Sequence, residues 1–202
     1  KLLLDKDVDK TIIESTIKHF DCKKVAEKLT SLLDDVPNVM GIYYLHRDDG
    51  QIIFMGKGNN IKNELTNQFI KTTKRGLKIQ EKTTSISYEI TGNLLLTNLK
   101  YYLELENNKP KYNLRSKKRI LLDGFNNDNM LLIDKGRTID EHSVIVIENN
   151  TVLGYCFTNL AFQENQLEVL KEMLTPINNK KLAKTIIKNY LRTKTRLKIV
   201  RF

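Results

Sequence analysis

The amino-acid sequence predicts an α+β fold, in which a small antiparallel sheet flanked by helices is followed by a second small α+β unit. Two pairs of short apolar segments, within 39–55 and 143–157, are each joined by a polar turn, which is the pattern of β-hairpins. Elsewhere, apolar residues recur at helical spacing. The 202-residue chain is 40% hydrophobic and 29% charged, which suits one large globular core or two small ones.

The first hairpin is predicted to have strands over 39–45 and 51–55. Between them lies Asp49-Gly50, a dipeptide typical of tight hairpin turns. A helix is then expected from about 60 to 72, because apolar residues follow one another at intervals of one turn. These residues are Ile61, Leu65 and Phe69.

Two more helices and a strand complete the first unit. A short helix is expected over 77–82 and a strand over 85–90, where apolar and polar residues alternate. The sequence Thr-Gly-Asn at 91–93 is suited to cap a helix over 94–106. The segment Pro-Lys-Tyr-Asn at 110–113 follows that helix.

The second unit is predicted from the same kinds of pattern. Its expected elements are a strand over 130–134, a hairpin over 143–148 and 151–157, helices over 164–174 and 181–191, and a closing strand over 197–202. Before the first unit, two packing helices are expected over 10–20 and 21–33. These patterns divide the chain into a helical segment at 1–36, a first α+β domain at 37–119 and a basic α+β unit at 120–202.

The positive charge of the chain is concentrated in two stretches. The net charge is +10, and the stretches 109–119 and 180–202 contain fifteen basic residues and no acidic residue. Such localised charge indicates a polyanionic partner, and we expect nucleic acid, with DNA ahead of RNA. The alternatives are a protein partner with an acidic surface, or a merely solvated basic face.

The compartment is predicted from what the sequence lacks. No apolar run approaches the ~20 residues that a membrane helix needs, so no membrane association is expected. Cys22 and Cys156 are far apart and show no metal-binding spacing. A reducing, cytoplasmic location is therefore expected. Because the sequence begins without Met, we also expect it to be part of a longer chain.

The first hairpin and the segment after the long helix resemble the GIY-YIG nuclease module, the fold of the N-terminal domain of UvrC. The first half of the signature is Gly-Ile-Tyr-Tyr at 41–44, and the second half has become Phe-Met-Gly at 54–56. The helix lengths and the segment at 110–113 are also similar. The resemblance implies a metal-dependent endonuclease fold that acts on DNA in repair or replication.

The remainder resembles the C-terminal region of a bacterial family, typical of Bacteroidetes. In that family an exonuclease domain related to the proofreading subunit of DNA polymerase III precedes a GIY-YIG module. A strand that ends in Asp-Lys-Gly-Arg, here at 134–137, is shared. Residues 1–9 resemble the last helix of the exonuclease domain, which implies that exonuclease activity would belong to a preceding part of the full protein.

The resemblance implies five site positions. Tyr43 and Asn113 match the family, whereas the second tyrosine has become Phe54, the phosphate-binding arginine has become Glu64, and the metal-binding glutamate has become Tyr101. A phenol is a poor ligand for a hard cation, and a carboxylate repels a phosphate. The chain is therefore predicted to bind no metal and to have lost cleavage, since such groups act together.

The predicted function is nucleic-acid binding without catalysis. The residues expected to contact nucleic acid are Lys57, Lys62, Lys71, Lys74, Arg75, Lys109, Lys111, Arg115, Lys117, Lys118, Lys184, Lys188 and Arg192. One alternative is an active endonuclease that uses Mg²⁺ or Mn²⁺, if Glu64 or Glu104 replaced the lost metal ligand. The other is a module that docks on protein or RNA. The sequence does not indicate an oligomeric state.

Overall fold

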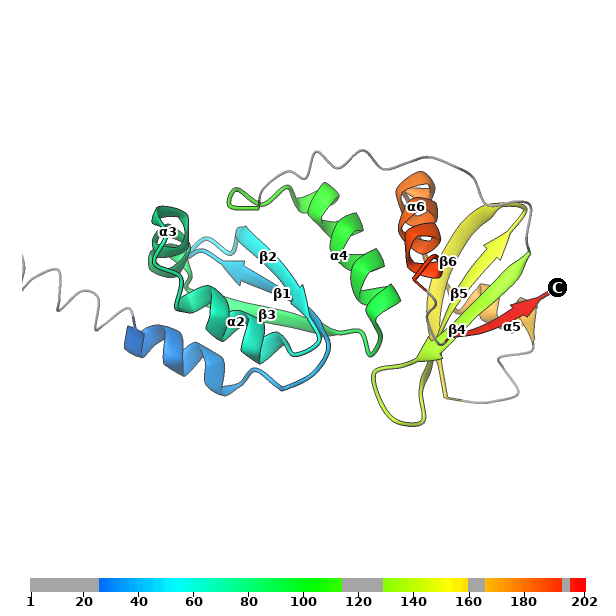
Figure 1. Cartoon of the computed structure of the whole chain (residues 1–202), viewed down its shortest axis with the longest axis horizontal. Coiled ribbons are helices and arrows are strands. Elements are labelled where there is room, and N and C mark those ends of the chain that lie inside the picture. The colour runs from blue at the N-terminus through cyan, green and yellow to red at the C-terminus, as the bar shows by residue number, and fades with distance from the viewer. Residues whose placement is uncertain (1–25, 114–128, 160–165, 194–196) are drawn as a thin grey trace, which may run out of the picture.

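The computed structural model describes residues 26–113, 129–159, 166–193 and 197–202 (Figure 1). It contains two antiparallel sheets with helices packed on them, which confirms the predicted α+β class. A helix over 26–34 precedes the first sheet and ends one residue beyond the expected range of 21–33. The helix expected over 10–20 lies outside the described residues.

Three strands form the first sheet in the order β2-β1-β3. The turn of the hairpin contains Gly50, whose φ of +78° is a conformation that glycine adopts at little cost. The central strand pairs with both neighbours in antiparallel register, so that Tyr43 lies opposite Gly56 on one side and Tyr88 on the other. The strands are β1 (Gly41–His46), β2 (Ile52–Gly58) and β3 (Ser85–Ile90).

Helices α2 (Ile61–Phe69) and α3 (Lys74–Lys82) follow the hairpin. Asn60 caps the first of them by accepting a hydrogen bond from the backbone N–H of Asn63. Thr73 caps the second, which therefore begins three residues before the sequence-based expectation of 77. Their apolar sides meet one face of the sheet in a core of Val36, Tyr43, Leu45, Ile53, Ile61, Leu65 and Ile79.

Five strands form the second sheet in the order β7-β6-β5-β4-β8. The predicted second hairpin is confirmed, and its turn residues Asn149 and Asn150 have φ values of +48° and +62°. The helix expected over 164–174 covers only Leu167–Glu172 among the described residues, and Thr175 and Pro176 form a short strand that pairs with β6. The strands are β4 (Met130–Lys135), β5 (His142–Glu148), β6 (Thr151–Thr158), β7 (Thr175–Pro176) and β8 (Lys198–Arg201).

Three helices remain: α4 (Leu94–Asn108), α5 (Leu167–Glu172) and α6 (Lys180–Leu191). Helix α5 covers one face of the second sheet, where Leu170 is fully buried, and α6 covers the other. None of the helices in the described ranges combines the length and the apolar character required to span a bilayer.

Helix α4 lies between the two sheets (Figure 1). One side of it contacts β1 and β2. The other side contributes Leu95, Leu96 and Leu99 to a core that also contains residues of β4, β5, β6 and α6. A helix that the sequence assigns to the first domain thus helps to build the core of the second unit, while the boundary near residue 119 stays a prediction.

The start of α4 is fixed to the second sheet by polar contacts. Asn93 caps α4 through the N–H of Leu96, and its Nδ2 donates to the carbonyl of Lys135 and to the hydroxyl of Ser143, both at 2.7 Å. Gly92 has a φ of +78°, and a Cβ there would overlap the backbone carbonyl of Gly136. The chain can pass between the two units at this point only because residue 92 has no side chain.

Candidate functional site

Tyr43 is the centre of the candidate site. It projects from β1, and its ring covers Gly56 on the neighbouring strand so closely that a Cβ at position 56 would overlap the ring. The ring of Phe54 lies 6.3 Å away between centroids. Burial raises the pKa of Tyr43, and the nearby Glu64 and Tyr101 raise it further. The hydroxyl therefore stays protonated at neutral pH.

Glu64 projects from the first turn of α2 toward the same site. Its side chain lies over Gly58, where a Cβ would overlap the Glu64 Cγ. The residue is exposed, and its charge contributes to the raised pKa of Tyr43. The structure thus places a carboxylate near the tyrosine hydroxyl, where the resemblance implies an arginine.

Tyr101 reaches the site from α4. Its hydroxyl accepts a hydrogen bond from Asn113 Nδ2 at 3.3 Å. The Lys57 ammonium lies 5.0 Å from the centroid of the Tyr101 ring and 4.5 Å from that of Tyr102, and it donates to Asn98 Oδ1. Burial lowers the pKa of Lys57 and raises that of Tyr101. Lys57 is thus engaged by aromatic rings and an amide rather than extended into solvent.

Asn113 holds the segment after α4 against the outer edge of β2. Its Oδ1 accepts from the Met55 N–H and its Nδ2 donates to the Met55 carbonyl, both at 2.8 Å. The Tyr112 N–H donates to the Ile53 carbonyl at 3.0 Å. The Asn113 side-chain amide therefore pairs with the edge strand β2 as the backbone of a further strand would. The same amide also hydrogen-bonds to Tyr101 and so helps to position it.

The Asn113→Ala variant is expected to lower the free energy of unfolding by about 1–3 kcal/mol, because two backbone groups of Met55 lose their partner. Urea unfolding measures the loss, and hydrogen exchange at the Met55 amide should become faster. The matched control is Asn67→Ala on the exposed side of α2. An unchanged unfolding midpoint together with unchanged Met55 exchange would show that the amide does not hold the edge.

Arg75, which the sequence predicts as a contact to nucleic acid, also packs against residues of this site. Its guanidinium lies 5.9 Å from the centroid of the Phe54 ring and donates through Nη2 to the Tyr112 carbonyl. Its charge partly offsets the rise in the pKa of Tyr101. Arg75 Nε is the one buried side-chain nitrogen or oxygen in the described ranges without a hydrogen-bond partner. No sequence spacing links residues 54, 75 and 112, because only the packing of α3 brings them together.

The other predicted nucleic-acid contacts fall into two sets. The first set belongs to the first unit, in α2 and α3 or in the segments that follow α2 and α4: Lys62, Lys71, Lys74, Lys109 and Lys111. The second set lies on and just after α6: Lys184, Lys188 and Arg192. Lys71 donates to Gln68 Oε1, and Lys184 donates to Asn150 Oδ1. Helix α4 lies between α2 and α3 on one side and α6 on the other, so the basic residues of α2 and α3 lie apart from those of α6 (Figure 1). Arg115, Lys117 and Lys118 lie outside the described residues.

Glu104 does not approach Tyr43. Its carboxylate accepts a hydrogen bond from the hydroxyl of Tyr44. Successive residues of a strand point to opposite faces, so the side chains of Tyr43 and Tyr44 diverge. The replacement of the lost metal ligand by Glu104 is therefore not supported. Within the described part of the chain, no three His, Cys, Asp or Glu residues form a group able to hold a metal ion.

Comparisons with known proteins identify relatives for part of the chain. No family model matches it. A segment of 96 residues is 33% identical to the UvrABC system protein C of Petrotoga mobilis, covering 43% of this chain and 16% of that protein. A segment of 90 residues is 32% identical to the corresponding protein of Rickettsia bellii, covering 44% and 14%. The match thus spans between about one seventh and one sixth of the length of these relatives.

Solved structures of one UvrC domain are also similar to part of the chain. One is the GIY-YIG N-terminal endonuclease domain of UvrC from Thermotoga maritima with its catalytic divalent cation, at 22% identity and a TM-score of 0.41, covering 44% of this chain and 98% of that domain. The magnesium-bound form has a TM-score of 0.40. On the sequence similarity, this part of the chain is homologous to the GIY-YIG domain of UvrC.

Proposed function

We propose that this chain is a catalytically degenerate GIY-YIG module that binds nucleic acid, with DNA as the partner, in a repair or replication context in the cytoplasm. Homology to UvrC supports the nucleic-acid context. The loss of cleavage is inferred from the surroundings of Tyr101, where a protonated phenol lies beneath the Lys57 ammonium.

The residues at this site do not fit a divalent cation. Mg²⁺ and Mn²⁺ favour carboxylate oxygens, and a neutral phenol offers no charge to offset that of the metal. The Lys57 ammonium near the Tyr101 ring adds electrostatic repulsion at the same position. Glu64 offers a carboxylate near Tyr43, but its negative charge would repel the phosphate of a nucleic acid at this site.

Binding without cleavage remains chemically reasonable, because Lys57 and Arg75 contact residues of the site and further lysines lie on the same unit. Lys74 is exposed at the start of α3, and Arg75 follows it with its guanidinium fixed by Phe54 and Tyr112. Phosphate contacts of this type give affinity that falls steeply with salt and depends little on base sequence. The retained Tyr43, Lys57 and Asn113 favour the alternative, an active metal-dependent endonuclease, which the same experiment tests.

The test measures cleavage and binding on nicked and branched duplex DNA. In Mg²⁺ or Mn²⁺ we expect no product above the protein-free control, and we expect the Kd to be the same in EDTA. Between ~50 and ~200 mM salt the affinity should fall by at least tenfold. A salt-independent Kd would contradict nucleic-acid binding, and cleavage that is abolished by Tyr43→Phe would establish the endonuclease instead.

A matched pair of variants locates the binding surface. The Lys71→Ala/Lys74→Ala variant should weaken binding and make the slope of log K against log salt shallower by about 1–2. Lys82→Ala, at the opposite end of α3, should leave both quantities unchanged. Equal effects of the two changes would indicate general electrostatic attraction by the basic chain rather than contacts at the site.

A further inference from the structure

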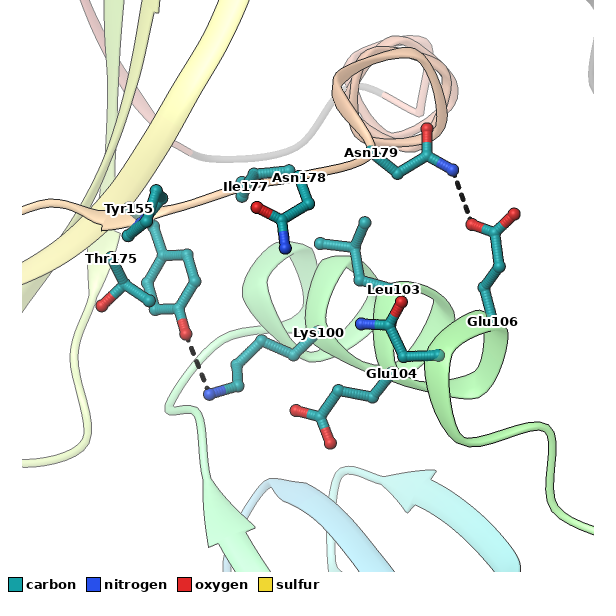
Figure 2. Close-up of a pocket in the computed structure, with 11 residues that line it drawn as sticks. Lys100, Leu103, Glu104, Glu106, Tyr155, Thr175, Ile177, Asn178 and Asn179 are labelled. Atoms are coloured by element: carbon teal, nitrogen blue, oxygen red, sulfur yellow. Dashed lines mark hydrogen bonds between the residues drawn. The ribbon is translucent and has the colours of Figure 1, made fainter.

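A pocket of about 220 Å³ lies between α4, Tyr155 of β6 and the segment 175–179 (Figure 2). Its walls combine apolar side chains with amides and charged groups. The lining residues that matter here are Leu103, Glu104, Glu106, Asn107, Ile177 and Asn178. Figure 2 shows Asn178 and Glu104 on facing walls, one from the segment before α6 and the other from α4.

Lys100 is the one basic side chain among the described residues that line this pocket, and its charge is already neutralised. Lys100 is almost completely buried, forms an ion pair with Glu89 and donates to the Tyr155 hydroxyl at 3.0 Å. Glu104 and Glu106 line the same pocket, and neither has an ion-pair partner among the described residues. The pocket is therefore acidic in a chain whose net charge is +10.

Each of the two carboxylates accepts one hydrogen bond from the described residues. Glu104 receives one bond from Tyr44, and Glu106 receives one from Asn179 Nδ2 at 2.6 Å. A carboxylate can accept about four hydrogen bonds. Burial raises the pKa of Glu104 despite the opposing effects of Tyr44 and Lys100, which means that its negative charge is under-compensated.

We propose that this pocket binds an alkylammonium group, whose charge is complementary to Glu104 and Glu106. The amide oxygens of Asn107 and Asn178 provide further acceptors for its N–H groups. Leu103 and Ile177 provide apolar surface for the methylene chain that carries the ammonium. The proposal concerns a surface of α4 separate from the Tyr43 site and does not depend on the proposed nucleic-acid function.

The dimensions of the pocket fit a ligand of this class. A volume of about 220 Å³ corresponds to roughly seven water-sized groups, and an ammonium on a four-carbon stem needs fewer than that. Two sources provide the same chemistry: a diffusible diamine, and a lysine side chain of a protein. A nucleotide phosphate would be repelled by the two carboxylates.

The test is isothermal titration calorimetry of the full chain with three probes: 1,4-diaminobutane, Nα-acetyl-lysine amide, and the neutral Nα-acetyl-norleucine amide. We expect saturable binding of at least one amine and none of the norleucine probe. Binding of the diamine alone identifies a diffusible amine, and binding of the lysine probe alone identifies a side chain. The absence of saturable binding for both amines, or equal binding of norleucine, would overturn the proposal.

Matched variants assign the binding to the pocket. Glu104→Gln keeps an acceptor for the Tyr44 hydroxyl but removes the charge, and it should raise the Kd by at least about tenfold. Glu106→Gln, at an exposed position, should raise it several-fold and serves if Glu104→Gln perturbs folding. Glu81→Gln, which is exposed on α3, should leave the Kd unchanged. Binding that is insensitive to both pocket variants would place the ligand elsewhere and refute the proposal.

Discussion

Restoring the three replaced side chains together, in the variant Phe54→Tyr/Glu64→Arg/Tyr101→Glu, is expected to give cleavage of nicked or branched DNA that requires Mg²⁺ or Mn²⁺. The variant returns a carboxylate to α4 and an arginine to α2, around a Tyr43 whose position is already set by Gly56. A bound metal stabilises a reacting phosphate by several kcal/mol, so the gain should be roughly a thousandfold or more over the unchanged chain. Product formation on a labelled duplex measures it.

The partial variants separate metal binding from catalysis. Tyr101→Glu alone should bind Mn²⁺ weakly, because the new carboxylate lies beside the Lys57 ammonium and an ion pair competes with the metal. It should not cleave, since Glu64 still repels the phosphate. Adding Tyr43→Phe to the triple variant should abolish the regained activity. A triple variant that binds Mn²⁺ and DNA but produces no cleavage would mean that the scaffold itself has changed.

The Leu99→Ala variant should have the largest effect on stability. Leu99 is fully buried in α4 and contributes to the core that α4 shares with β4, β5, β6 and α6. Truncation of such a leucine costs about 2–5 kcal/mol, because the packing contacts are lost and a cavity remains. For a chain of this size the melting temperature should fall by roughly 4–20 °C. Urea unfolding and calorimetry measure the two quantities.

Leu94→Ala is the matched control, because Leu94 lies on the same helix and is 44% exposed. It should change the free energy of unfolding by about 0.5 kcal/mol or less. Since α4 packs on both sheets, Leu99→Ala should also accelerate hydrogen exchange in β1 and β5 together. Faster exchange in one sheet alone would show that the two sheets unfold independently of the shared helix.

Most elements of the fold follow from local sequence signals. The turns at Gly50 and at Asn149-Asn150 and the cap at Asn93 were all predictable, because each depends on a few neighbouring residues. The start of α3 was not predictable from the sequence. Thr73 caps that helix in a stretch of mostly polar residues, where no apolar periodicity indicates a helix. The contact of α4 with both sheets was also not predictable, because apolar periodicity identifies the buried face of a helix but not the sheet that packs on it.

The candidate site was predictable in its positions but not in its contacts. The resemblance located Tyr43, Glu64 and Tyr101, and the structure brings them near one another. The stacking of Lys57 on Tyr101 and the approach of Arg75 to Phe54 depend on how α3 and α4 pack on the sheet. Those contacts determine which charges surround the Tyr101 hydroxyl. They could not be predicted because they join residues that are far apart in the sequence.

The segment at 110–113 closes the outer edge of β2 through the amide of Asn113. An unpaired strand edge offers a row of free N–H and C=O groups to any other chain in an extended conformation. By engaging both backbone groups of Met55, this one side chain protects the hairpin from intermolecular strand addition next to Tyr43. Association by edge-to-edge pairing is thereby directed away from β2, toward the opposite edge strand of that sheet, β3.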